Sequence, residues 1–217
     1  MNKTQLLSAA FLSVGLVTTQ AANLLTNSSF EVITPAPGYG NNFSPVVTDW
    51  TMVSVPGSSI NVVNPLGSYA DGPNNAQDGA LYLDIADGAG YYQQSFTLST
   101  LSTLEISGYF SRRNAPGGGS VSIYSADNMT LLFQSTPAFN TLAVTEEVWT
   151  LSTGNSLTAA GGPVTFAAGT YVFRFSIDDS GNGDSAFLEA TPFTPIPEPS
   201  VAILGVIGFL SIARRRR

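Results

Sequence analysis

"TYVFRFSI", residues 170–177, has the clearest periodicity in this chain of 217 residues. Its large apolar side chains fall at every second position: Tyr171, Phe173, Phe175 and Ile177. Successive side chains of a β-strand point to opposite faces, so this spacing places all four on one face. The stretch therefore predicts a strand with one face buried in a core.

The same alternation recurs in three further stretches: "ALYLDI" at 80–85, "LEISGYF" at 104–110 and "SVSIYS" at 120–125. Clusters rich in Gly, Asp and Pro separate such stretches, for example at 87–88 and 116–119, and these residues favour turns. No window between the two ends of the chain has a convincing helical period. Many short, half-buried strands predict an all-β fold, which we expect to be a single β-sandwich of the jelly-roll type spanning 22–190.

The N-terminal end has the features of a secretory signal peptide. Lys3 gives a positive start, residues 6–17 are almost all apolar, and Thr19 and Ala21 are small residues at the −3 and −1 positions of a cleavage site. We therefore expect residues 1–21 to be removed and the mature chain to begin at Ala22. A cut one residue later is the alternative.

The C-terminal end combines three features in order. Pro197, Glu198 and Pro199 follow a Pro/Thr-rich spacer at 191–195, and an uncharged, mostly aliphatic run then fills 201–213. As a helix that run would reach about 20 Å, which is short for a hydrocarbon core of roughly 30 Å. The four terminal residues, Arg214, Arg215, Arg216 and Arg217, are costly to move across a membrane, so we expect them to stay cytoplasmic and the rest of the chain to lie outside.

In this arrangement, residues 196–217 resemble the PEP-CTERM sorting signal. The resemblance implies that the secretion machinery exports the chain and that a membrane-embedded exosortase recognises the tail and cuts near Pro-Glu-Pro. It also implies transient anchoring in the inner membrane through 201–213, with a final location in the cell envelope or outside the cell. A plain C-terminal membrane anchor is the alternative, and it has the same topology.

Composition excludes several classes of function. Without the two end segments, three cations remain against 14 or 15 carboxylates, a net charge of −11 or −12, which argues against nucleic acid as a partner. The chain has no cysteine and no histidine. This removes disulfides, Ser-His-Asp and Cys-His catalysis, and the usual zinc ligand sets. Enzymes that use only carboxylates, such as glycosidases, remain open.

The body resembles galactose-binding-like carbohydrate modules in several short stretches. These include "NLLTNSSFE" at 23–31, "DWT" at 49–51 and "GYYQQSFTL" at 90–98. The resemblance implies a jelly roll that binds extracellular polysaccharide through aromatic faces, amides and arginine. The candidate ligand-binding residues are Trp50, Tyr92, Gln94, Tyr109 and Arg112. Packing in the core is the alternative for Trp50, because large rings dominate sandwich cores.

A structural calcium is the one cofactor that we expect. In the modules that this chain resembles, such an ion often joins the first strand to the last, and Glu31 and Glu189 are the carboxylates at the matching places. In addition, "DDSGNGDSAFLE" at 178–189 has oxygen-bearing side chains at alternate positions, Asp184 among them, in the spacing of a calcium loop. A polar hairpin turn between the last two strands is the alternative for that stretch.

Together these features predict an exported protein that is not an enzyme and that is matrix-associated or carbohydrate-binding. One alternative is a polysaccharide-active enzyme, whose nearest carboxylate pairs are Asp84 with Asp87 and Glu146 with Glu147. The other is a passive structural surface protein without a specific ligand. We identify no catalytic residue from the sequence.

Overall fold

The computed structural model describes residues 22–34, 40–43, 46–54, 59–64, 75–87, 90–112, 119–135, 148–156, 164–177 and 181–193. The predicted signal peptide at 1–21, the sorting signal at 196–217, and Glu146 and Glu147 lie outside these residues. The ranges that are described contain strands and no helix, and therefore no helix that could cross a membrane.

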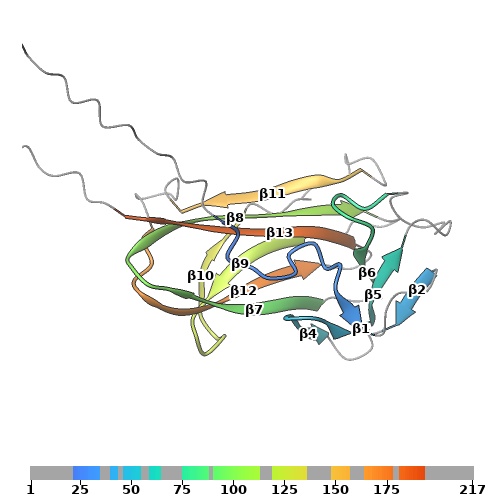
Figure 1. Cartoon of the computed structure of the whole chain (residues 1–217), viewed down its shortest axis with the longest axis horizontal. Helices are drawn as coiled ribbons and strands as arrows, with labels where there is room; N and C mark the ends of the chain where they lie inside the picture. The colour runs from blue at the N-terminus through green and yellow to red at the C-terminus, as the bar shows by residue number, and fades with distance from the viewer. Residues whose placement is uncertain are drawn as a thin grey trace, which may run out of the picture.

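The strands form two large sheets that pack face to face (Figure 1). The five-stranded sheet has the order β10 (Leu131–Gln134), β9 (Gly119–Tyr124), β12 (Gly169–Ile177), β7 (Gly90–Leu98) and β4 (Thr51–Ser54). The six-stranded sheet has the order β11 (Thr150–Asn155), β8 (Ser102–Arg112), β13 (Gly181–Pro192), β6 (Tyr82–Asp87), β5 (Ser59–Asn64) and β2 (Gly40–Phe43). A small pair, β1 (Ile33–Thr34) and β3 (Val46–Val47), completes the fold. The predicted all-β sandwich is confirmed.

The core lies between the two large sheets, and the period-two stretches face it as predicted. Phe173, Phe175 and Ile177 are at most 1% exposed, and the Phe175 ring stacks on that of Phe110 with centres 4.6 Å apart. A Cβ atom at Gly183 would lie 2.4 Å from the Phe175 ring, so only glycine leaves room for the ring there. Gly183 therefore faces the core, and its neighbours on β13 face outward.

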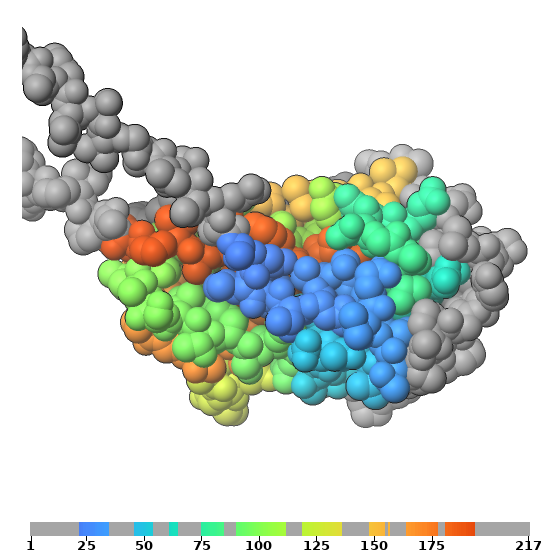
Figure 2. Space-filling view, in the orientation of Figure 1, coloured from blue at the N-terminus to red at the C-terminus, as the bar shows by residue number. Residues whose placement is uncertain are grey.

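The N-terminal segment, residues 22–30, lies beside β13 (Figure 2). The Leu24 amide donates to the Leu188 carbonyl at 2.9 Å, and the Ala186 amide donates to the Ser28 carbonyl at 2.7 Å. β13 has a register irregularity between Asp184 and residue 187, which changes the side-chain alternation along this strand. The start of the chain thus pairs with its last described strand.

Two sequence expectations differ from the fold at this strand. Residues 181–189 are extended in β13, so they cannot wrap one ion as a calcium loop does, and the loop interpretation is wrong. β13 also continues to Pro192, two residues into the stretch that we assigned to the spacer.

Candidate functional site

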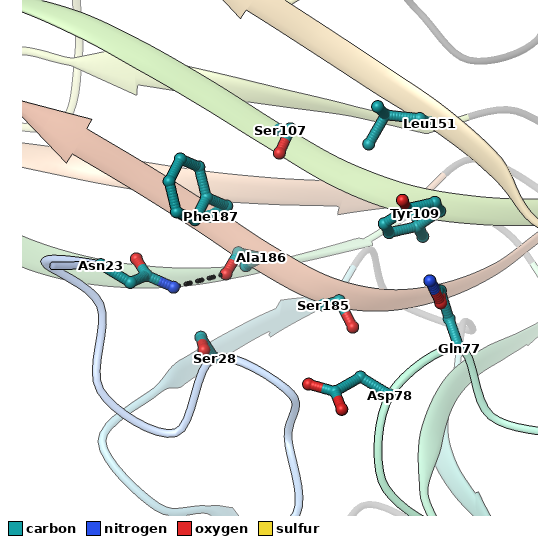
Figure 3. A pocket seen from close by; sticks show the side chains of 10 residues that line it. All are labelled: Asn23, Ser28, Gln77, Asp78, Ser107, Tyr109, Leu151, Ser185, Ala186 and Phe187. Carbon is teal, nitrogen blue, oxygen red and sulfur yellow. Dashed lines mark hydrogen bonds between the residues drawn. The ribbon is translucent and has the colours of Figure 1, made fainter. Parts of the chain in front are cut away.

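An open groove of about 430 Å³ lies on the outer face of the six-stranded sheet (Figure 3). Its floor comes from adjacent strands, with Ser107 and Tyr109 on β8 and Ser185 and Phe187 on β13. Leu151 of β11 extends the floor on one side. The groove is therefore centred on the sheet that contains the last strand.

Two segments outside the sheet form the walls of the groove. Asn23 and Ser28 come from the N-terminal segment, and Gln77 and Asp78 come from the segment before β6. The Asn23 side chain fixes the first wall, because its Nδ2 donates to the Ala186 carbonyl and its Oδ1 accepts from the Leu188 amide, both at 3.0 Å.

Two carboxylates fix the second wall. Asp184 Oδ2 accepts from the Gln77 amide at 2.7 Å and from the Asp78 amide at 3.1 Å. Glu31 Oε1 accepts from the amides of residues 80 and 81 at 2.9 and 2.8 Å. These four bonds hold residues 77–81 against the sheet, so both acids position the groove.

Asp184 also has an unusual electrostatic setting. Its side chain has no exposed surface, and burial raises the pKa of its carboxyl group from 3.8 to about 7. The two backbone amides and Ser185 favour the charged form and oppose this shift, but desolvation dominates. A carboxyl group with a pKa near neutrality therefore lies beside the groove.

The groove combines aromatic and polar side chains in the manner of a saccharide site. Tyr109 and Phe187 are half-buried on adjacent strands, with hydroxyl, amide and carboxylate groups around them. Aromatic rings pack on the apolar faces of sugar rings, while polar groups at the rim bond to hydroxyls. The arrangement can bind a hydroxyl-rich ligand that also has an apolar face.

The predicted ligand-binding residues separate into two groups. Tyr109 faces outward into the groove, as its alternation predicted. Trp50, Tyr92 and Gln94 are wrong as ligand contacts, because they are at most 9% exposed. Arg112 ends β8, and its side chain lies outside the described part of the structure.

The three interior residues have structural roles instead. The Trp50 ring contacts the Phe30 ring in the core, with centres 5.0 Å apart, and its Nε1 donates to the carbonyl of Thr26 at 3.1 Å. Burial raises the pKa of the Tyr92 hydroxyl well above its usual 10. Gln94 accepts from the Thr26 amide at 2.9 Å and donates to its carbonyl at 3.1 Å, so it joins β7 to the N-terminal segment.

The predicted calcium ligands do not form one cluster. Glu31 and Asp184 bind backbone amides, and Glu189 pairs across the strands with Glu105. Among the described residues, no group of three carboxylates, imidazoles or thiols surrounds a common point. The Asn23 side chain joins the N-terminal segment directly to β13. Calcium binding stays a prediction.

The sequence comparisons assign no family, because no family model and no curated protein matches the chain. Similar solved structures do exist. A Stig cyclase from Fischerella sp. TAU, solved with a pyrrolidinylidene indole, has a TM-score of 0.59 at 17% identity over 80% of this chain and 100% of its own. A cyclase of the same source with 4-(1H-indol-3-yl)butan-2-one has a TM-score of 0.56 at 16% identity over 81% and 100%. A carbohydrate-binding module solved with β-1,4-galactotriose is more distant, with a TM-score of 0.48 at 13% identity over 79% and 100%.

At these identities the likeness shows the fold alone. It nevertheless corrects one expectation, which was that this chain is not an enzyme. Four similar structures with TM-scores of 0.56 to 0.59 are cyclases, so the fold is one on which enzymes are built. The expectation depended on the lack of histidine and of a recognisable pair of carboxylates in the sequence, and neither excludes every kind of enzyme.

Proposed function

We propose that the chain is an exported protein of the cell envelope or extracellular matrix that binds polysaccharide in the groove of the six-stranded sheet. One observation supports this most directly: Tyr109 and Phe187, on adjacent strands, share an open groove with polar side chains from four separate segments. The net charge of the part between the two end segments favours a neutral ligand over an anionic one.

The proposed export rests on the two ends of the chain. An apolar stretch after Lys3 leads to a small-residue cleavage site, and the Pro-Glu-Pro, apolar run and arginines follow in the order of a PEP-CTERM signal. Intact-mass analysis of protein from a host that has an exosortase tests this. Loss of residues 1–21 and of Arg217 is expected, and a secreted product that keeps Arg217 contradicts processing of the tail.

Affinity electrophoresis tests polysaccharide binding. The unmodified protein should migrate more slowly in gels that contain its polysaccharide. Tyr109→Ala and Phe187→Ala should each weaken the binding about tenfold, because one aromatic contact is lost. Tyr91→Ala is the matched control, since Tyr91 is also half-buried but lies on β7 in the other sheet. No retardation in any of a broad panel of polysaccharides, or equal loss in the control, contradicts the proposal.

Catalysis in the same groove is a second candidate, and Asp78 favours it, because it brings a carboxyl group to the lining of the groove. A carboxyl group within reach of a bound ligand can donate or accept a proton. Release of reducing ends from a retained polysaccharide is the measurement. Asp78→Asn should abolish that release. Retardation of the unmodified protein without any release of reducing ends contradicts this second candidate.

A further inference from the structure

Asp78 is the only charged residue among the described residues that line the groove. Figure 3 shows its carboxylate extending from the wall into the space between Ser28 and Ser185. Asp184 and Glu31 use their carboxylates to hold the wall, whereas the Asp78 side chain stays exposed at the surface of the groove. The carboxylate of Asp78 is therefore available to a ligand.

The backbone on both sides of Asp78 is held in place. The Asp78 amide donates to Asp184 Oδ2 at 3.1 Å, and Glu31 Oε1 accepts from the amides of residues 80 and 81. Between these anchors, Gly79 has a φ of +74°, and a Cβ atom there would overlap Glu31 Oε1. Only glycine fits this turn, which packs directly on Glu31. Asp78 consequently presents its carboxylate from a fixed position in the wall.

No described cation neutralises this carboxylate. Arg174 is the only lysine or arginine whose side chain the structure describes, and it lies on the five-stranded sheet between two tyrosine rings. The residues that hold the wall, Asp184 and Glu31, are acids themselves. A ligand that fills the groove removes water from the Asp78 carboxylate, which costs free energy unless the ligand supplies a positive charge. The favoured ligand therefore carries its own cation.

The rest of the groove indicates what kind of cation fits. An ammonium group has three donors, and its bonds to a carboxylate are stronger than those of a neutral hydroxyl group. The ring faces of Tyr109 and Phe187 attract ammonium groups and also pack on the apolar face of a sugar ring. A lysine-rich peptide would supply the charge but no hydroxyl groups. The remaining polar side chains of the groove suit sugar hydroxyls: Asn23, Ser28, Gln77, Ser107 and Ser185.

We infer that the groove selects a saccharide with free amino groups, such as an unacetylated hexosamine chain, whose ammonium group pairs with Asp78. This inference rests on the proposed function and names the chemical class of its ligand. An acetyl group on the amine removes the charge, so the acetylated form of the same chain should bind less tightly. Because Asp78 is exposed, the expected preference is about fivefold, and it should increase at low salt.

Calorimetric titration with a matched pair of ligands tests the inference. The pair consists of glucosamine and N-acetylglucosamine oligomers of the same length and linkage, at about pH 6, where amines carry a proton. The unmodified protein should prefer the glucosamine oligomer about fivefold. Asp78→Asn, which keeps the shape of the side chain, should bind both oligomers equally. Its Tm should stay unchanged, because the wall is held through the amide of Asp78 and not through its side chain.

Asp127→Asn is the matched control, since it removes one exposed carboxylate from the five-stranded face, and it should keep the preference. Tyr109→Ala should weaken the binding of both oligomers, because both pack on its ring.

Equal affinity of the unmodified protein for the two oligomers overturns the inference. Equal loss of the preference in Asp78→Asn and Asp127→Asn also overturns it, because attraction by the net charge would then explain the preference. Equally tight binding of a lysine oligomer of the same charge would show that the groove does not select a saccharide. If neither sugar oligomer binds but another polysaccharide retards the protein in the gel, the inference is wrong and the proposed function stands. If no polysaccharide retards the protein either, both are wrong.

Discussion

The two outer faces of the sandwich differ in how far their polar side chains are buried and hydrogen-bonded. On the five-stranded sheet, Arg174 lies between two rings, with its Cζ 4.4 Å from the centre of the Tyr91 ring and 3.7 Å from that of Tyr124. Its Nε donates to Asn128 Oδ1 at 2.9 Å and its Nη2 to the Asn128 carbonyl at 2.7 Å. These contacts give the half-buried Arg174 guanidinium hydrogen-bond acceptors and two ring faces, and they fix the turn before β10.

On the six-stranded sheet, the polar side chains are more deeply buried, and fewer of their polar atoms have a hydrogen-bond partner. Asn182 and Ser111 have at most 1% exposure and no partner among the described residues, and Asp184 holds a carboxyl group with a pKa near 7. A groove with two aromatic side chains lies beside them. The difference fits the proposed division of roles, in which the five-stranded face serves stability and the six-stranded face serves binding, at some cost in stability.

The largest expected effect concerns the pH dependence of stability. The folded state raises the pKa of Asp184 from 3.8 to about 7, so the protonated form favours folding. Its contribution is complete below about pH 4 and is lost as the pH rises to about 7, by about 4 kcal/mol. Asp184→Asn keeps an oxygen for the two amides, so it should flatten this part of the profile and unfold at higher urea than the unmodified protein at pH 8.

Asp127, on the five-stranded face, provides the control. Its bond from the Ser125 hydroxyl lowers the pKa of its carboxyl group, so its contribution is lost as the pH falls, the opposite direction to Asp184. Asp127→Asn should leave the range from pH 4 to pH 7 unchanged. Equal profiles for the unmodified protein and Asp184→Asn contradict the assignment of this pH dependence to the six-stranded face.

The second effect concerns Arg174. Arg174→Ala removes two hydrogen bonds and two ring contacts, and should lower the free energy of unfolding by about 2 kcal/mol. Urea unfolding measures the loss, and polysaccharide binding should not change. Arg174→Lys keeps the charge but not the paired donors, so an intermediate value is expected. If Arg174→Ala reduced the retardation by polysaccharide and left the free energy of unfolding unchanged, the five-stranded face would be the binding face, and the assignment of roles would be wrong.

The smallest effect concerns Glu31 and calcium. Glu31→Gln keeps an acceptor for the amides of residues 80 and 81 but removes the charge, and should cost about 1 kcal/mol. If calcium binds here, it raises the Tm of the unmodified protein and not that of the variant. An unchanged melting curve of the unmodified protein in excess chelator contradicts calcium binding.

The inward face of each strand could be predicted from the sequence, because it depends on local alternation. The stretches at 104–110 and 170–177 indicate which residues enter the core, and the structure agrees. Tyr109 could be placed on the outside for the same reason. The outer face could not be predicted in the same way, because its burial depends on segments that are distant in sequence.

Four residues illustrate this limit. Asn23 binds β13 across 163 positions, which no local pattern reveals. Phe187 reaches the groove because the register of β13 changes after Asp184, and strict alternation from Gly183 would place it in the core. Trp50 and Tyr92 looked suitable for stacking on sugars, but their rings fill the space between the sheets. Composition identifies an aromatic residue, while only the tertiary fold decides which side of the sheet it occupies.

The most direct test of the account is a map of amide chemical shifts upon addition of oligosaccharides from a polysaccharide that retards the protein. We expect changes in residues 102–112 of β8 and 181–193 around β13, together with 75–81. We expect none in 119–124 of β9 or 169–177 of β12. Changes centred on β9 and β12 would place the ligand on the five-stranded face and contradict the division of roles between the two sheets.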